Sequence, residues 1–231
     1  GRDLDTNRKI AIAVGILFIV ATCAAVIQFP LITSTNAPDY LIQIAADGNK
    51  IMTSVLLDVL MIAAVVAIPV VLFPVLRKQG EGIARMYLAA RLFEAIPLAI
   101  STISLLMLLV LSREYVAAGA PVGTHFETFG AILQAQWDLA LVIGGQIVFC
   151  MTALVLNVAL YRSRLVPRFL SIWGLVGVPL MLAGSFLVLY GVVEDSSTIQ
   201  TALMVPLAVQ EMAFALWLIV KGFNPSAATS T

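Results

Sequence analysis

The chain has 231 residues and a formal net charge of +0, with 61% hydrophobic residues, 11% charged residues and a mean hydropathy of +1.04. A soluble domain is usually about half apolar and about a quarter charged, so most of this chain must face lipid. The balanced charge gives no reason to expect a nucleic-acid partner. One histidine (His125) and two cysteines inside apolar runs (Cys23 and Cys150) favour neither a metal site nor a disulfide framework, and no cofactor is expected.

Six apolar runs follow one another, each near the roughly 20 residues that cross a bilayer. We expect transmembrane helices over residues 10–29, 51–76, 84–111, 134–160, 169–190 and 199–220. Helices are favoured over a barrel because the runs are continuous and show no two-residue alternation. The first run follows basic residues, as a signal peptide would, but its length indicates a retained helix. The sequence thus predicts an all-α polytopic membrane protein, a bundle of six transmembrane helices in one membrane domain covering 1–231.

The connections between the runs differ in length and charge. Short polar turns are expected at 77–82 and 161–168, and longer loops at 31–50 and 112–133, whose periodicity does not decide whether they are helical. With the N-terminus on one side, that side carries ten Lys and Arg residues, whereas the other side carries only Lys50 and Arg113. The positive-inside rule then predicts a cell (inner) membrane protein with both termini in the cytoplasm.

Five ionisable residues fall inside the predicted spans: Asp58, Arg91, Glu94, Asp138 and Glu211. Each costs roughly 2.5–3.5 kcal/mol at a helix centre, so such residues usually face the bundle interior and find partners. Counting along the helices places Arg91, Glu94 and Glu211 in the inner half, where Glu211 is the expected partner of Arg91, and Asp58 with Asp138 in the outer half. Four acids against one base imply protons, water or a cation at the site, so we interpret these five residues as a ligand-, ion- or proton-binding set.

The same residues also have a structural interpretation, in which buried charges only fix the packing of the helices. Other polar and small residues of the spans fit that interpretation. Gln146, Asn157 and Gln210 are predicted to form hydrogen bonds between helices. Close helix packing is predicted at Gly144, Gly145, Gly174, Gly177 and Gly184.

Several segments resemble the domain-of-unknown-function 4386 family of bacterial and archaeal multi-pass integral membrane proteins. The resemblance covers most of the chain, and its most specific parts are the Arg91–Glu94 pair, the "RLVPRFL" turn after the fourth span and the stretch from Glu211 to Gly222. It implies a multi-pass helical membrane protein and names no biochemical activity.

Two functional hypotheses follow for this protein in its lipid bilayer. The first is transport or binding of a small molecule, an ion or a lipid at the acid-rich intramembrane cluster. The second is a non-catalytic structural or interaction subunit, and either is compatible with a homo-oligomer. No HExxH, GxSxG or Walker motif occurs, so the sequence leans away from an enzyme without deciding the point. An intramembrane dyad of Asp58 and Asp138 is conceivable, but no motif supports it.

Overall fold

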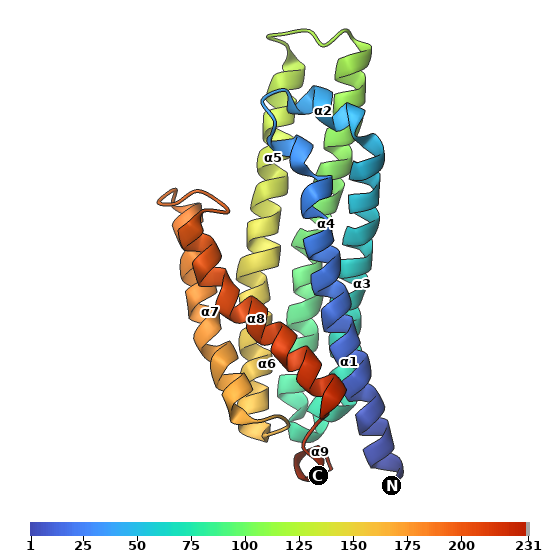
Figure 1. The fold of residues 1–231 in the computed structure, drawn as a ribbon, viewed down its shortest axis with the longest axis vertical. Helices are drawn as coiled ribbons and strands as arrows, with labels where there is room; N and C mark the ends of the chain where they lie inside the picture. The colour runs from blue at the N-terminus through green and yellow to red at the C-terminus, as the bar shows by residue number, and fades with distance from the viewer. Residues whose placement is uncertain (230–231) are drawn as a thin grey trace.

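The computed structural model describes residues 1–229 and forms a bundle of long helices with both chain ends at the same end of the bundle (Figure 1). The α-helices are α1 Arg2–Ile27, α2 Tyr40–Ala46, α3 Gly48–Gln79, α4 Glu81–Ala117, α5 His125–Val142, α6 Phe149–Ser163, α7 Arg168–Leu189, α8 Thr198–Val220 and α9 Pro225–Ala228. Two 3₁₀ turns, η1 Phe29–Leu31 and η2 Thr33–Asn36, precede α2, and a π-helical turn, η3 Ile143–Val148, joins α5 to α6. The described residues contain no strand.

Six helical segments are long and apolar enough to cross a membrane. They are Arg2–Leu31, Gly48–Gln79, Glu81–Ala117, His125–Ser163, Arg168–Leu189 and Thr198–Val220. Each of them contains, within a residue at its ends, one of the six runs expected from the hydropathy. The predicted class, an all-α polytopic bundle with six spanning helices, is therefore confirmed.

The helices close into a ring around a shared core. α3 packs on α4 and α1, α5 packs on α4, and α7 forms a hairpin with α8. In Figure 1, α8 runs obliquely across the front of the bundle, and its last turns lie against α1. The rings of Phe18 on α1 and Phe214 on α8 meet edge to face with centroids 5.6 Å apart, and both side chains are buried. The contact between α1 and α8 therefore joins the first and last spans.

Arg8 fastens the end of α8 to α1. Its Nη1 donates to the carbonyl of Leu218 at 3.0 Å, and its Nη2 donates to the carbonyls of Ile219 and, at 3.3 Å, Val220. The last carbonyls of a helix have no partner inside the helix and carry its negative dipole end, so a guanidinium group suits them. Gly222, with φ +74°, then turns the chain out of the helix.

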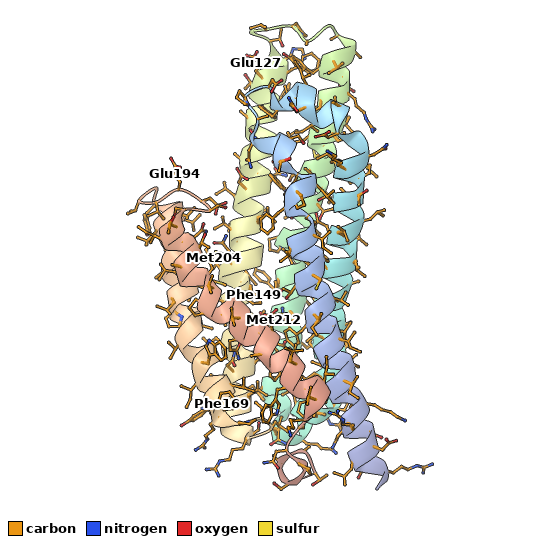
Figure 2. All side chains as sticks on the ribbon, in the orientation of Figure 1. Glu127, Phe149, Phe169, Glu194, Met204 and Met212 are labelled. Carbon is orange, nitrogen blue, oxygen red and sulfur yellow. The ribbon has the colours of Figure 1, made fainter. Side chains whose placement is uncertain are left out.

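The spanning helices differ in length by more than a bilayer half-thickness. α4 has 37 residues, whereas α7 has 22. At 1.5 Å per residue these lengths correspond to about 55 Å and about 33 Å, against a hydrocarbon core of about 30 Å. Glu127 near the start of α5 and Glu194 in the α7–α8 loop accordingly lie at different heights in Figure 2.

Helical structure continues through much of the two segments expected to be loops. α2 occupies part of the segment 31–50, and only residues 118–124 separate α4 from α5. Tyr115 near the end of α4 packs against Phe126 at the start of α5, with ring centroids 5.6 Å apart. This aromatic contact holds α4 and α5 together at the end of their hairpin, beyond the apolar run of α4.

Four of the five glycines predicted to pack closely do so. A Cβ atom on Gly144 would lie 2.9 Å from Pro97 Cγ, and one on Gly177 would lie 3.0 Å from Leu207 Cβ. Gly174 abuts the side chain of Asn157, and Gly184 abuts Leu203. The prediction is wrong for Gly145, because no atom lies within 4 Å of the position of its Cβ. Gly145 instead borders the cavity described below.

We expect Gly15→Ala to destabilise the bundle at the contact between α1 and α8. A Cβ atom on Gly15 would lie 2.6 Å from Ile219 Cγ1 and 2.7 Å from the carbonyl oxygen of Ala215, which is backbone and cannot turn away. The two helices must separate, and such overpacking costs about 1–3 kcal/mol of unfolding free energy. The control is Gly82→Ala on α4, where nothing lies within 4 Å. Thermal unfolding in detergent compares the two, and equal melting temperatures for them would contradict this packing.

Candidate functional site

The charged residues of α4 form a buried pair. Arg91 and Glu94 are three residues apart and therefore share one face of the helix. Arg91 Nη1 donates to both carboxylate oxygens of Glu94, at 3.2 Å and 3.0 Å, and Arg91 Nε donates to the hydroxyl oxygen of Tyr87 at 3.0 Å. The side chains of Arg91 and Glu94 are only 3% and 2% exposed. One face of α4 thus supplies the cation, its counter-ion and a hydroxyl partner.

Aromatic rings from three segments enclose the guanidinium group. The Cζ atom of Arg91 lies 5.5 Å from the ring centroids of Phe18 and Tyr87, and 5.8 Å from that of Phe149. These are distances at which a cation is attracted to the face of an aromatic ring, and the attraction is stronger where water is excluded. In Figure 2, Phe149 lies midway along the bundle, next to α8. The rings come from α1, α4 and α6, so the cation holds three helices together.

A threonine on α6 completes the shell of Glu94. Thr152 Oγ1 donates to Glu94 Oε1 at 3.0 Å, and the same hydroxyl lies 2.8 Å from the carbonyl oxygen of its own helix neighbour Phe149. Thr152 and Phe149 both follow the π-helical turn η3. Such turns are rare and frequently occur at functional sites. The turn brings Gly144 against Pro97 of α4, a contact that a larger residue would prevent.

Beside this pair lies a cavity with a volume of about 200 Å³. Its polar part consists of Arg91, Glu94, Glu211 and Thr22, which come from α4, α8 and α1. Glu211 Oε1 accepts a hydrogen bond from Thr22 Oγ1 at 3.4 Å. Apolar side chains form the walls: Phe18, Val65, Ile68, Leu98, Phe149 and Ala208.

Two polar atoms of this cavity are left without a protein partner. Within residues 1–229, no hydrogen bond uses Arg91 Nη2, and none uses Glu211 Oε2. One is a donor with positive charge, and the other is an acceptor on a carboxyl group. The cavity therefore offers two complementary hydrogen-bonding groups to a molecule that enters it.

The three residues predicted to form the inner cluster are brought together. Arg91, Glu94 and Glu211 line one cavity, and Arg91 attracts both glutamates electrostatically. The expected direct pairing of Arg91 with Glu211 is wrong, since the ion pair that Arg91 forms in the described chain is with Glu94. The physical reason is geometric. Glu94 lies one turn from Arg91 on the same face of α4, so both of its carboxylate oxygens reach Arg91 Nη1.

The outer residues do not form a group. Asp58 is 5% exposed and accepts a hydrogen bond from Thr102 Oγ1 at 3.1 Å, with Gln28 beside it. Asp138 is exposed on α5, and the nearby charge that acts on it is that of Asp195. No hydrogen bond between the two aspartates occurs in the described residues. Counting residues along a helix gives the depth of a side chain but not the direction in which it points around the bundle. For this reason the sequence grouped Asp58 with Asp138, whereas the structure gives them different neighbours.

The polar residues predicted to link helices do so. Gln146 on η3 accepts from Ser185 of α7 at 2.8 Å and from Gln200 of α8 at 3.1 Å. Gln210 on α8 donates to Asn157 of α6 at 3.1 Å and to the carbonyl of Leu170 on α7 at 2.9 Å. These bonds fasten α6, α7 and α8 to one another.

Other residues of the site were not foreseen from the sequence. They are Tyr87, Thr22 and Thr152, and the signal they offered was a hydroxyl group within an apolar run. Nor does the arrangement indicate a metal centre: within residues 1–229, no three His, Cys, Asp or Glu side chains are placed to hold an ion.

We expect Arg91→Ala to lower the free energy of unfolding by about 3–5 kcal/mol, because Glu94 would remain buried without its cation. The control is Arg85→Ala on the same helix. Arg85 pairs with Glu81 at 2.9 Å, but those side chains are 71% and 59% exposed, so the change should stay within about 1 kcal/mol. Unfolding by denaturant in detergent measures both variants. If both variants lose a similar free energy of unfolding, burial does not determine how much an ion pair stabilises this protein.

Comparisons with known proteins assign a family to this architecture. The family model described as a domain of unknown function (DUF4386) matches residues 12–222, which is most of the chain. No curated protein and no solved structure matches the chain. The match agrees with the resemblance seen in the Arg91–Glu94 pair and the last span. The chain therefore belongs to the domain of unknown function 4386 family.

Proposed function

We propose that this membrane protein binds or carries a small amphipathic molecule that enters the Arg91–Glu211 cavity from the bilayer. The observation that supports this most directly is the pair of unpartnered polar atoms, Arg91 Nη2 and Glu211 Oε2, at one side of an otherwise apolar cavity. A structural ion pair alone needs no such cavity. Sites for small molecules are typically apolar with a few convergent polar groups.

The charges of the cavity define the polar end of the ligand. Glu94 already neutralises Arg91 through a bidentate contact, so Glu211 is the acid without a basic partner of its own. A group that accepts from Arg91 Nη2 and donates to Glu211 satisfies both free atoms. Hydroxyl, carboxamide and hydroxy-ammonium groups have this property, whereas a bare anion has no hydrogen to donate to Glu211.

The size and the edges of the cavity define the rest of the ligand. A volume of about 200 Å³ equals the share of about six or seven water molecules in the liquid, which is too small for a whole phospholipid. Val26, Gly145 and Ala208 line the cavity and are also exposed on the outside of the bundle, where the solvent is lipid. An apolar tail can therefore extend past this rim into the bilayer while the polar end stays inside.

A second candidate function is structural, and one observation favours it. The Arg91–Glu94 pair is bound by Thr152 of α6 and surrounded by rings of α1 and α6, so it fixes the relation of three helices. In this alternative the protein is a non-catalytic packing or interaction subunit. It assigns no role to Glu211 Oε2 or to the open space beside Gly145, which is why we place it second.

For the location of the protein we propose the cell (inner) membrane, with both termini in the cytoplasm. Apart from the buried Arg91, ten of the twelve Lys and Arg residues are assigned to the side of the termini, and an even number of spans puts both termini on one side. A fluorescent protein fused to the C-terminus should then be bright, and a periplasmic phosphatase fused there should be inactive. The opposite pattern would reverse the orientation.

We expect Gly145→Leu to abolish ligand retention without unfolding the protein. Nothing lies within 4 Å of the Cβ position, so a side chain can begin there without a clash, and a leucine is large enough to occupy the cavity rim. Gly145→Ala is the matched control, since a methyl group leaves most of the volume open. The measurement is mass spectrometry of the organic extract of each protein, purified in gentle detergent. A compound retained by the wild type and by Gly145→Ala should fall at least about tenfold in Gly145→Leu.

Glu211→Gln provides a chemical counterpart to this steric test. The amide has the same shape but carries no charge and accepts a hydrogen bond more weakly, so less of a ligand that donates to Glu211 should be retained, at similar thermal stability. Glu194→Gln, in the exposed α7–α8 loop, controls for the change of charge. If the wild type and all four variants yield the same extract and differ in stability alone, the structural alternative stands and ligand binding fails.

A further inference from the structure

A second, cationic pocket lies at the end of the bundle that carries both termini. It has a volume of about 620 Å³ and lies between the α6–α7 turn and the end of α8. Three basic residues line it, together with a tryptophan: Arg164, Arg168, Lys221 and Trp217. None of these residues borders the central cavity, so the pocket is a separate site.

Two chain turns build this pocket and are bonded to each other. Arg164 ends α6 in the left-handed conformation, with φ +55°, and Pro167 precedes the first residue of α7. On the other side, Gly222 turns the chain out of α8 with φ +74°. The backbone N–H of Asn224 donates to the carbonyl of Leu165 at 2.7 Å, which ties the two turns together. The pocket is therefore part of the fold rather than a gap between loose segments.

Within residues 1–229, its three cations form no ion pair. The ion pairs of the described residues involve other bases at this end of the bundle, namely Lys9 with Asp5 at 3.2 Å and Arg85 with Glu81 at 2.9 Å. Arg168 lies over the ring of Tyr161, with Cζ 4.6 Å from the centroid, and Arg164 and Lys221 are exposed. Three basic side chains that line one pocket and form no ion pair within residues 1–229 favour an anion.

The pocket also lies where the polar headgroups of a bilayer begin. α7 starts at Arg168 and α8 ends at Val220, and both helices are of bilayer length. The ring of Trp217 meets that of Phe169 edge to face, with centroids 6.2 Å apart, and Phe169 is exposed near the start of α7 (Figure 2). Tryptophan is enriched at this depth of a membrane. An anion here would sit beside apolar surface that faces acyl chains.

We propose that this pocket binds the phosphate headgroup of an anionic phospholipid, with the acyl chains along α7 and α8. Arginine presents planar pairs of N–H donors that match phosphate oxygens, and lysine adds a point charge. Basic pockets between transmembrane helices are suited to anionic headgroups. The first turn of α7 adds free backbone N–H groups at the same place.

The test uses the full chain in nanodiscs made from equal parts of phosphatidylglycerol and phosphatidylcholine with identical acyl chains. Native mass spectrometry counts the lipids that stay bound. The pocket variant is Arg164→Gln, Arg168→Gln and Lys221→Gln together. The control variant is Arg2→Gln, Arg77→Gln and Lys78→Gln, which removes the same charges from exposed residues at the same end. Each cation near an anionic lipid contributes a factor of about five in affinity, so the pocket variant should bind phosphatidylglycerol on the order of 100-fold more weakly.

Retention of phosphatidylglycerol over phosphatidylcholine by the wild type and the control, and its loss in the pocket variant, supports the proposal. Equal retention in all three proteins overturns it. The second experiment adds inorganic phosphate to lipid-free protein and measures the melting temperature. If phosphate stabilises the wild type but not the pocket variant, and the nanodiscs show no lipid preference, the pocket binds free phosphate. The assignment to a lipid headgroup then fails. Should the triple variant not fold, the double variant Arg164→Gln, Lys221→Gln is compared in the same way, since neither side chain forms a hydrogen bond or ion pair within residues 1–229.

Discussion

The bidentate contact between Arg91 and Glu94 is the interaction on which the rest of the bundle interior depends. A single charge at this depth in lipid is unfavourable by several kcal/mol, and a pair is tolerated only when its remaining donors and acceptors are satisfied. Tyr87 and Thr152 supply partners for Arg91 Nε and Glu94 Oε1, and the rings of Phe18 and Phe149 cover the cation. Among residues 1–229, Arg91 Nη2 is the one nitrogen of this guanidinium group that is left to the cavity. Because these residues come from α1, α4 and α6, neutralising one pair fixes the mutual position of three helices.

The central cavity and the cationic pocket use charge in opposite ways. In the central cavity the arginine is neutralised within the protein, and the free polar atoms are few and deep. In the pocket near Trp217 the cations form no ion pair within residues 1–229 and lie at the ends of two helices of bilayer length. The first arrangement suits a weakly polar group inside an apolar body, and the second suits a full anion that stays hydrated on one side.

Hydropathy determined the fold class because lipid leaves helices as the ready solution for continuous apolar runs. The cost of burying charge then identified Arg91, Glu94 and Glu211 as neighbours in depth, and the structure places all three at one cavity. Hydropathy does not give the direction of a side chain around the bundle: Asp138 is exposed and lies near Asp195, whereas Asp58 is buried and bonds to Thr102. Thr152 and Phe149 were missed for a related reason: a hydroxyl and a ring in an apolar run look the same whether they face lipid or a buried carboxylate. The sequence did not predict the extension of α4 from residue 112 to Ala117, because polar residues beyond the apolar run carry no hydropathy signal.

The π-helical turn between α5 and α6 sets the rotational phase of everything that follows it. A π turn bonds residues five apart instead of four, so the segment Ile143–Val148 takes up one extra residue while the helix continues. Successive residues of an α-helix are about 100° apart, so the same residues wound as a regular α-helix would turn α6 by about that amount. Thr152 would then swing away from Glu94, and Asn157 would swing away from Gln210, in a single step. Two chains with indistinguishable hydropathy profiles can therefore differ in this interior according to whether these six residues form a π turn.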